Sequence, residues 1–344
     1  MSYFLGIDYP TWWFLLLGGV FTGYAILDGF DLGAGAWHLF FRKEHSRRVA
    51  LNAVGPVWDG NEVWLVIGGG ALFAGFPHVY ATLFSAMYIP FMLFLVFLIF
   101  RAISIEFRSK EPMLWWRKTW DIAYSVSSIV LALSLGIVLG NVLLGMPIGA
   151  DKEFAGNWLA FLNPYAFLVG LTSLALFMMH GAIYLTMKTE GRLFAKVTIL
   201  LRNAIIFFVL AFVITSTYTL IYIPHLSDRF TESPGLFIVP LLAFLSIANI
   251  PRLARRRKYR SAFLFSSLTV ALLLILVAIE LYPVVLLSTL DPQYSLTVYN
   301  SAASDKSLGI MLGFAAVGIP LVGAYTLFVY RTFAGVVQLD EMSY

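Results

Sequence analysis

The sequence contains no cysteine, and only 12% of its 344 residues are charged. Without cysteine, disulfides, thiolate metal sites and a cysteine nucleophile are all excluded. Hydrophobic residues make up 60% of the chain and aromatic residues 16%, with a mean hydropathy of +0.84, far outside the range of soluble domains. No polar linker rich in Pro, Gly or Ser separates the apolar runs. The sequence therefore predicts a single polytopic membrane domain over residues 1–344.

Apolar runs long enough to cross a bilayer, which takes about 20 residues, recur along the whole chain. The expected spans are 12–37, 54–75, 79–105, 122–146, 158–187, 199–223, 235–250, 262–287 and 307–330. These runs are too long for barrel strands, which alternate with period two over about 10 residues. The seventh run is short and contains Pro240, which leaves a broken or strongly tilted helix as an option there. The predicted fold class is an all-α integral membrane protein of about nine transmembrane helices.

Lys and Arg residues divide unevenly between the connections that these spans define. Of 23 in all, only Lys152, Arg229 and Lys306 fall in the even-numbered connections. The others lie in or beside the odd-numbered connections and in the C-terminal tail. By the positive-inside rule the odd-numbered connections and the C-terminus are cytoplasmic, and the N-terminus is outside. The basic run ARRRKYR is therefore interpreted as a topogenic loop in contact with anionic lipid, not as a nucleic-acid site.

Ionisable side chains also fall within or at the ends of the predicted spans, mostly toward the cytoplasmic side. The candidates are Asp28, Asp31, Asp59, Glu62, Arg101, Glu106 and Asp121. An acid at a helix centre costs about 2.5–3.5 kcal/mol on insertion scales, less if it is paired, hydrated or protonated. Asp28 and Asp31 are three residues apart, as are Asp59 and Glu62, so each pair can share a helix face that points into the bundle.

Two interpretations of these acids remain open. They can tie helices together through hydrogen bonds and an ion pair with Arg101, or they can form a proton or cation path that starts at the cytoplasm. The path is favoured for the group as a whole, because tethering does not require so many acids of one sign. Glu280, near the outer end of the eighth span, is a weaker candidate for an exit or a quinone contact, and an interfacial position is favoured for it.

Residues suited to hold a cofactor are scarce. Among the histidines, only His180 lies well within a predicted span, and haem coordination by two histidines would need a second one facing it. His180 is therefore expected to be a hydrogen-bonded packing residue, with a single-ligand role as the alternative. The glycine-rich runs GGVFTG and GGGALFAG lie inside spans, where small residues allow close helix packing. No metal or cofactor site is assigned to this chain.

Several segments carry a resemblance to a known family. They include GFDLGAG (29–35), GPVWDGNEVWL (55–65), GGGALFAGFP (68–77), FRAISIEFRSK (100–110), RKTWD (117–121) and GNVLLGMP (140–147). The agreement continues through FLNPYAFLVG, HGAIYLTMKT and FLFSSLT and so covers nearly the whole chain. In these segments the sequence resembles subunit II of the cytochrome bd-type quinol oxidases.

The resemblance implies two four-helix bundles plus one peripheral helix, in a subunit paired side by side with a similarly folded subunit I. Haems b and d and the quinol-oxidising loop are expected in that partner. The complex would sit in the bacterial inner membrane, reduce oxygen to water with electrons from quinol, and take protons from the cytoplasm without pumping. A structural quinone and a small accessory subunit are both compatible with the resemblance.

The resemblance also implies residue roles. Asp59, in the WDGN motif, matches the family's proton path near the subunit interface, and Asp28, Asp31, Arg101 and Asp121 fall on its acidic or basic positions. Glu62 departs from relatives that carry Gln at this place, so its role stays open.

Two other classes of function remain as alternatives. A proton-coupled secondary transporter would bind its coupling ion between inverted repeats near the membrane midplane. The acids here lie off-centre, which argues mildly against it. A passive scaffold for a catalytic partner is the third hypothesis.

Overall fold

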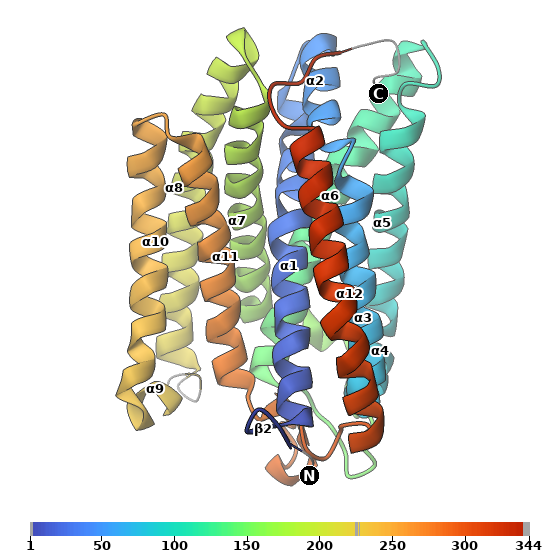
Figure 1. The fold of residues 1–344 in the computed structure, drawn as a ribbon, viewed down its shortest axis with the longest axis vertical. Helices are drawn as coiled ribbons and strands as arrows, with labels where there is room; N and C mark the ends of the chain where they lie inside the picture. The colour runs from blue at the N-terminus through green and yellow to red at the C-terminus, as the bar shows by residue number, and fades with distance from the viewer. Residues whose placement is uncertain (1–2, 224–225, 227, 340–344) are drawn as a thin grey trace.

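The computed structural model describes residues 3–223, 226 and 228–339 and shows a bundle of long helices that lie side by side (Figure 1). The helices are α1 (Tyr9–Trp37), α2 (Glu44–Val54), α3 (Trp58–Gly75), α4 (Pro77–Ala86), α5 (Tyr88–Phe107), α6 (Leu114–Leu144), α7 (Pro164–Lys188), α8 (Gly191–Tyr222), α9 (Asp228–Glu232), α10 (Ile238–Arg255), α11 (Tyr259–Leu281) and α12 (Asp305–Thr332). Within the described ranges eight helices are long and apolar enough to span a membrane, or nine if the bent pair α3–α4 counts as one more. This agrees with the predicted fold class. The position of the C-terminus itself lies outside the described residues.

The third predicted span, 79–105, is wrong as a continuous helix. Helix α4 turns by 119° from α3, ends at Ala86, and is followed after Met87 by α5. Pro90 explains the second break, because its ring collides with the carbonyl group four residues earlier, that of Ala86, and it has no N–H to donate. At about 1.5 Å per residue, the ten residues of α4 are too few to cross a bilayer.

The seventh predicted span forms the unbroken helix α10, so the break considered at Pro240 is not present. A short 3-10 turn (Pro234–Phe237) precedes α10, and Pro240 is the third residue of α10. The first four N–H groups of a helix have no partner within it, so a proline here removes no hydrogen bond. A second proline, Pro251, lies inside α10, and the helix continues past it to Arg255.

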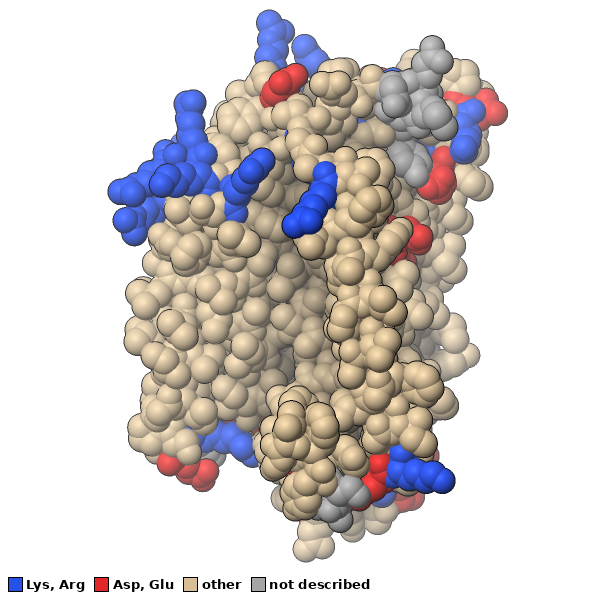
Figure 2. Space-filling view, in the orientation of Figure 1, with Lys and Arg blue, Asp and Glu red and all other residues tan. Residues whose placement is uncertain are grey.

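Basic side chains gather at one end of the bundle, which is called the basic end below. Figure 2 shows Lys and Arg at this end, a belt almost free of charge across the middle, and a few charges of both signs at the opposite end. The belt is exposed and apolar, as a surface in contact with lipid must be. Helix α2 at the basic end was not predicted, because it lies within the first basic connection, outside any apolar run.

Short elements close the opposite end. Strand β1 (Tyr3–Phe4) pairs with β2 (Ile7–Asp8), and β3 (Val284–Leu286) pairs with β4 (Leu296–Thr297), both antiparallel. The predicted eighth span, 262–287, is shorter than expected, because α11 ends at Leu281 and β3 follows. The Asp8 side chain accepts a hydrogen bond from the backbone N–H of Thr11 and caps the start of α1.

Helix α1 lies at the centre and packs against α3, α6, α7, α11 and α12. Its contact with α7 is so close that the two backbones touch. A Cβ atom on Gly33 would lie 1.8 Å from the carbonyl oxygen of Phe177, and one on Gly181 would lie 2.4 Å from the backbone nitrogen of Ala34. Only glycine fits at this crossing, as at small-residue contacts between membrane helices generally.

Candidate functional site

A cluster of charged side chains lies inside the bundle between α1, α3 and α5. Arg101 on α5 donates from Nη2 to Asp28 Oδ1 at 2.5 Å and from Nη1 to Asp28 Oδ2 at 3.1 Å. The same Nη1 lies 3.3 Å from Glu62 Oε2 on α3. Arg101 and Asp28 are fully buried, so each charge depends on the other in a medium of low dielectric constant. Asp28, Asp31, Asn61, Glu62 and Arg101 are called the buried charge cluster below.

Asp31, one helical turn from Asp28, has a different environment. Its Oδ2 accepts a hydrogen bond of 2.7 Å from the Asn61 amide, while no partner for Oδ1 is found among the described residues. Asn61 in turn accepts a hydrogen bond of 2.9 Å from the hydroxyl group of Tyr330 on α12. A buried carboxylate oxygen without a donor is costly as an anion. Asp31 is therefore the member of the cluster least fixed in its charged form by neighbours.

Asp59 differs from the expectation that it points into the bundle with Glu62. The buried face of α3 is formed by Asn61, Gly68, Leu72 and Gly75, whereas Asp59 is exposed on the outside of the chain. At 100° per residue, Asp59 is nearly opposite Asn61, and Glu62 lies between them at the edge of the buried face. Asp59 therefore lies on the outer surface of α3, one helical turn before Glu62 of the buried charge cluster.

Asp121 does not join the buried charge cluster, although the sequence placed it with Arg101. It belongs to a second group at the basic end, where its carboxylate contacts His38 Nε2 at 2.5 Å, Arg108 Nε at 2.6 Å and Arg47 Nη1 at 2.8 Å. Arg108 also donates to Glu44 at 2.9 Å. Burial lowers the pKa of the Arg108 guanidinium, but hydrogen bonds to Asp121 and Glu44 more than offset this and raise it above its ordinary value. This group, the basic-end network, joins the residues that directly follow α1 and α5 to α2 and α6.

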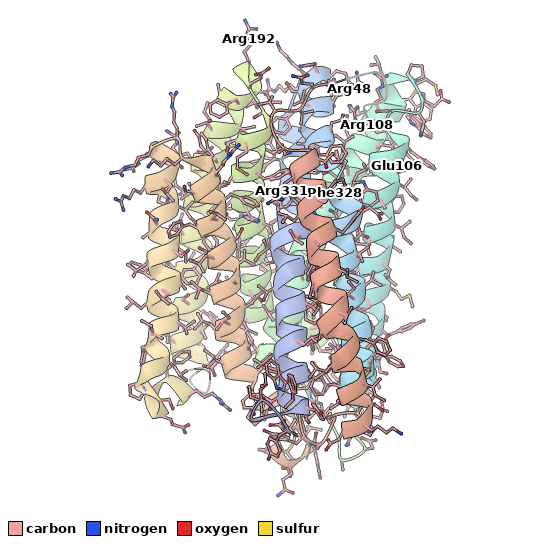
Figure 3. All side chains as sticks on the ribbon, viewed as in Figure 1. Arg48, Glu106, Arg108, Arg192, Phe328 and Arg331 are labelled. Atoms are coloured by element: carbon pink, nitrogen blue, oxygen red, sulfur yellow. The ribbon has the colours of Figure 1, made fainter. Side chains whose placement is uncertain are left out.

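The remaining candidates lie apart. Glu106 is half-buried in the last turn of α5, near Arg108 at the basic end (Figure 3). Glu280 is half-buried near the end of α11, at the opposite end of the molecule. His180 is fully buried in α7, where its Nε2 donates to the carbonyl oxygen of Ile26 at 3.0 Å and its Nδ1 lies 2.7 Å from Ser266 Oγ.

His180, the histidine buried within a span, is not placed as a haem ligand. Both ring nitrogens of His180 are engaged, and its ring stacks on Phe263 with 4.6 Å between centroids, which leaves no open coordination position beside it. His38 Nε2 is held by Asp121 in an ion-pair network. In the part of the chain that the structure describes, no group of three His, Asp or Glu residues could bind a metal ion.

Several residues that form or contact the buried charge cluster and the basic-end network were not predicted from the sequence. Asn61 and Tyr330 carry no formal charge, and His38 and Arg108 lie at span ends where polar residues are ordinary. The spacing of Asp31 and Asn61 in the sequence could not indicate their contact, because it depends on how α1 and α3 pack. The WDGN motif was a usable signal for Asn61, since a side-chain amide inside a span needs a partner.

Tyr330→Phe is expected to lower the free energy of unfolding by about 1 kcal/mol, because it removes one hydrogen bond to a buried amide. Helix α12 lies on the outside of the bundle with Leu308 as its buried residue, so the Tyr330 hydroxyl is a main polar contact to the rest of the chain. Thermal unfolding of the detergent-solubilised protein measures the change. Tyr325→Phe on the same helix is the control, because Tyr325 is 64% exposed. Equal behaviour of the two variants would contradict the role of Tyr330.

The fold and these groups define a class: a polytopic, all-α membrane protein with paired charges buried inside it. Comparison with known proteins narrows the class. The family model described as cytochrome bd terminal oxidase subunit II matches residues 9–333. The chain is 32% identical to cytochrome bd-I ubiquinol oxidase subunit 2 of Escherichia coli strain K12, covering 98% of each chain. It is 35% identical to cytochrome bd ubiquinol oxidase subunit 2 of Bacillus subtilis strain 168, covering 93% of this chain and 94% of that one.

A solved structure has the same fold. A chain of the bd oxidase from Geobacillus thermodenitrificans superposes with a TM-score of 0.77 at 20% identity, over 94% of this chain and 98% of that one. The chain therefore belongs to the family of cytochrome bd terminal oxidase subunit II, as its motifs indicated. It is a multi-pass protein of the bacterial inner membrane.

Proposed function

We propose that the chain is the haem-free subunit of a quinol:oxygen oxidoreductase and that it provides a proton uptake path from the cytoplasm toward the oxygen-reducing centre of subunit I. Family membership and the names of the relatives, which are subunits 2 of ubiquinol oxidases, support the complex and the partner. The same membership favours an oxidase subunit over a proton-coupled transporter.

The basic end is the cytoplasmic end in this proposal. Nearly all Lys and Arg residues outside the apolar belt gather there, as the positive-inside rule requires (Figure 2). The expected architecture would place α1, α3, α5 and α6 in one bundle, α7, α8, α10 and α11 in a second, and α12 at the periphery. The contacts of α1 with α3, of α5 with α6, of α7 with α8 and of α10 with α11 are compatible with it, and α1 and α6 also pack on α7.

The exposure of Asp59 beside the buried charge cluster carries the proposal. A carboxylate on the outer face of a membrane helix is costly if acyl chains surround it. Asp59 lies in the first turn of α3, where Val63, Val66 and Phe73 continue the same exposed stripe. Packing of subunit I on this stripe would cover Asp59 and place it at the subunit interface, with Glu62 as its link to the interior.

The contacts of each acid support a different role for it. Asp28 is held by two hydrogen bonds from Arg101 and acts as its counter-charge. Asp31 and the Asp59–Glu62 pair are the groups that exchange protons, because no arginine chelates them with two hydrogen bonds. Asp121 in the basic-end network is held by three basic side chains and anchors the helix ends.

Electron transfer and oxygen reduction would be supplied by haems b and d in subunit I; in this chain both ring nitrogens of the buried His180 are already engaged. The proton motive force would then arise without pumping, from protons taken up on the cytoplasmic side for oxygen reduction and protons released when quinol is oxidised. A structural quinone and a small accessory subunit are compatible with the proposal, and no residues are assigned to them.

Asp59→Asn in the assembled complex tests the path. The amide keeps the shape of the side chain but cannot carry a proton, so oxygen consumption is expected to fall at least tenfold, while haem content in the visible spectrum stays normal. Proton uptake from the cytoplasmic side should fall in parallel. Glu111→Gln, an exposed carboxylate between α5 and α6, is the matched control and should leave both rates unchanged.

Wild-type oxygen consumption and proton uptake in Asp59→Asn would refute the path and leave this chain as a scaffold for subunit I. Loss of haem together with activity would also count against it, because it would place Asp59 in assembly rather than in proton transfer.

A further inference from the structure

Helices α10 and α11 form a hairpin at the edge of the molecule, and a groove of about 510 Å³ runs along it. On α10 its lining includes Leu242, Leu245, Asn249 and Arg252, which recur on one helix face. On α11 it is lined by Phe265, Leu268 and Leu272, again on one face. The groove is therefore built from two packed helix faces, and no loop contributes to its lining.

The polarity of the groove changes along its length. Toward Leu242 and Leu272 its lining is apolar, whereas Asn249 and the exposed Arg252 line its end nearest the basic end of the molecule. Leu242 and Arg252 are ten residues apart, which corresponds to about 15 Å along the helix axis. This is half the thickness of a bilayer core of about 30 Å. The groove thus extends through one leaflet, with its polar end at the headgroup level.

The charge at the polar end is positive and unbalanced. Arg252 is followed by Arg255, Arg256, Arg257, Lys258 and Arg260, and residues 238–279 include no Asp or Glu. Figure 2 shows the resulting group of basic side chains over the ends of these helices. The one carboxylate of the hairpin, Glu280, lies at the far end of α11 from these cations, so a ligand with a negative head and an apolar tail complements the groove.

We propose that the α10–α11 groove binds one anionic phospholipid of the inner leaflet, with an acyl chain along Leu245, Phe265 and Leu268 and the phosphate at Arg252 and Asn249. Long-range attraction by the basic connection brings anionic lipid to this end, and Arg252 fixes the phosphate by charge-assisted hydrogen bonds. The site is independent of the proton path, since it lies on the other side of the molecule from α3.

Native mass spectrometry of the delipidated complex, titrated with phosphatidylglycerol in detergent, tests the site. Arg252→Gln is expected to weaken the first phosphatidylglycerol adduct at least fivefold. Ala248→Phe, which fills the groove from its lining, should do the same without any change of charge. Arg256→Gln is the matched control, because Arg256 is an exposed cation of the same connection that does not line the groove. The affinity of this variant for phosphatidylglycerol should stay within twofold of the wild-type value.

Three results would overturn the proposal. The first is equal weakening by Arg252→Gln and Arg256→Gln, which would mean diffuse attraction without a site. The second is equal affinity for phosphatidylcholine, which would mean that no anionic headgroup is recognised. The third is displacement of the lipid by added quinone, which would make the groove a quinone site. Unchanged oxygen consumption in Arg252→Gln would separate this site from the function proposed for Asp59.

Discussion

Gly33→Ala is expected to remove most of the folded protein from the membrane. The new methyl group would lie 1.8 Å from the carbonyl oxygen of Phe177, a backbone atom that cannot move without the whole of α7. Helices α1 and α7 would have to separate along their length, and α1 packs against most of the bundle. The expected loss of stability is about 3 kcal/mol, at the upper end of overpacking costs. Fluorescence-detected size-exclusion chromatography after detergent extraction measures the folded fraction.

Gly18→Ala is the control on the same helix, because no atom lies within 4 Å of a Cβ at Gly18. Alanine favours a helix over glycine by about 1 kcal/mol, so this variant should be neutral or slightly stabilised. Gly181→Ala, on the α7 side of the crossing, should reproduce the loss seen for Gly33→Ala. A normal folded fraction for Gly33→Ala would show that the helices are not as close as the structure has them.

Arg101→Met is expected to destabilise the protein by about 3–5 kcal/mol, the range found when one partner of a buried ion pair is removed. Asp28 would lose both hydrogen bonds from the guanidinium, and Glu62 would lose its contact at 3.3 Å. The fully buried Asp28 and the half-buried Glu62 would then lack their shared counter-charge. Thermal unfolding of the purified complex measures the effect.

The double variant Arg101→Met with Asp28→Asn separates the ion pair from the packing of Arg101. Removing both charges leaves fewer uncompensated groups, so the double variant should be more stable than Arg101→Met alone. The difference between the double variant and the sum of the single changes gives the coupling energy. Additive changes would mean that Asp28 and Arg101 do not form the ion pair seen here.

The contacts within the buried charge cluster and the basic-end network suggest a different role for each acid. The fact that an acid is buried would not distinguish these roles. Asp28 is paired with Arg101, and Asp121 is held by three basic side chains, so we expect substitution of either acid to affect stability. Asp31 is buried, Glu62 is half-buried and Asp59 is exposed on the outer face of α3, and we expect their substitution to affect proton transfer. Stability and activity measured on the same variants test this division.

Hydropathy and charge counts in the sequence were sufficient for the membrane class, the helical fold and the positions of most spans, because a bilayer requires about 20 apolar residues for each crossing. Motifs over nearly the whole length also identified the family. Pro90 could have indicated the break at Met87, since its effect on the preceding turn is local.

Only the tertiary structure decided which residues meet. Asp28 and Arg101 are 73 positions apart, and Asn61 and Tyr330 are 269 positions apart, so no local spacing links them. Helix packing also determines that Asp59 lies on the outer face of α3 and that Asp121 belongs to the basic-end network. The groove between α10 and α11 likewise exists only because these two helices pack together. The periodicity of a sequence determines the face of a helix on which a residue lies, but the partner of that face depends on which helices come into contact.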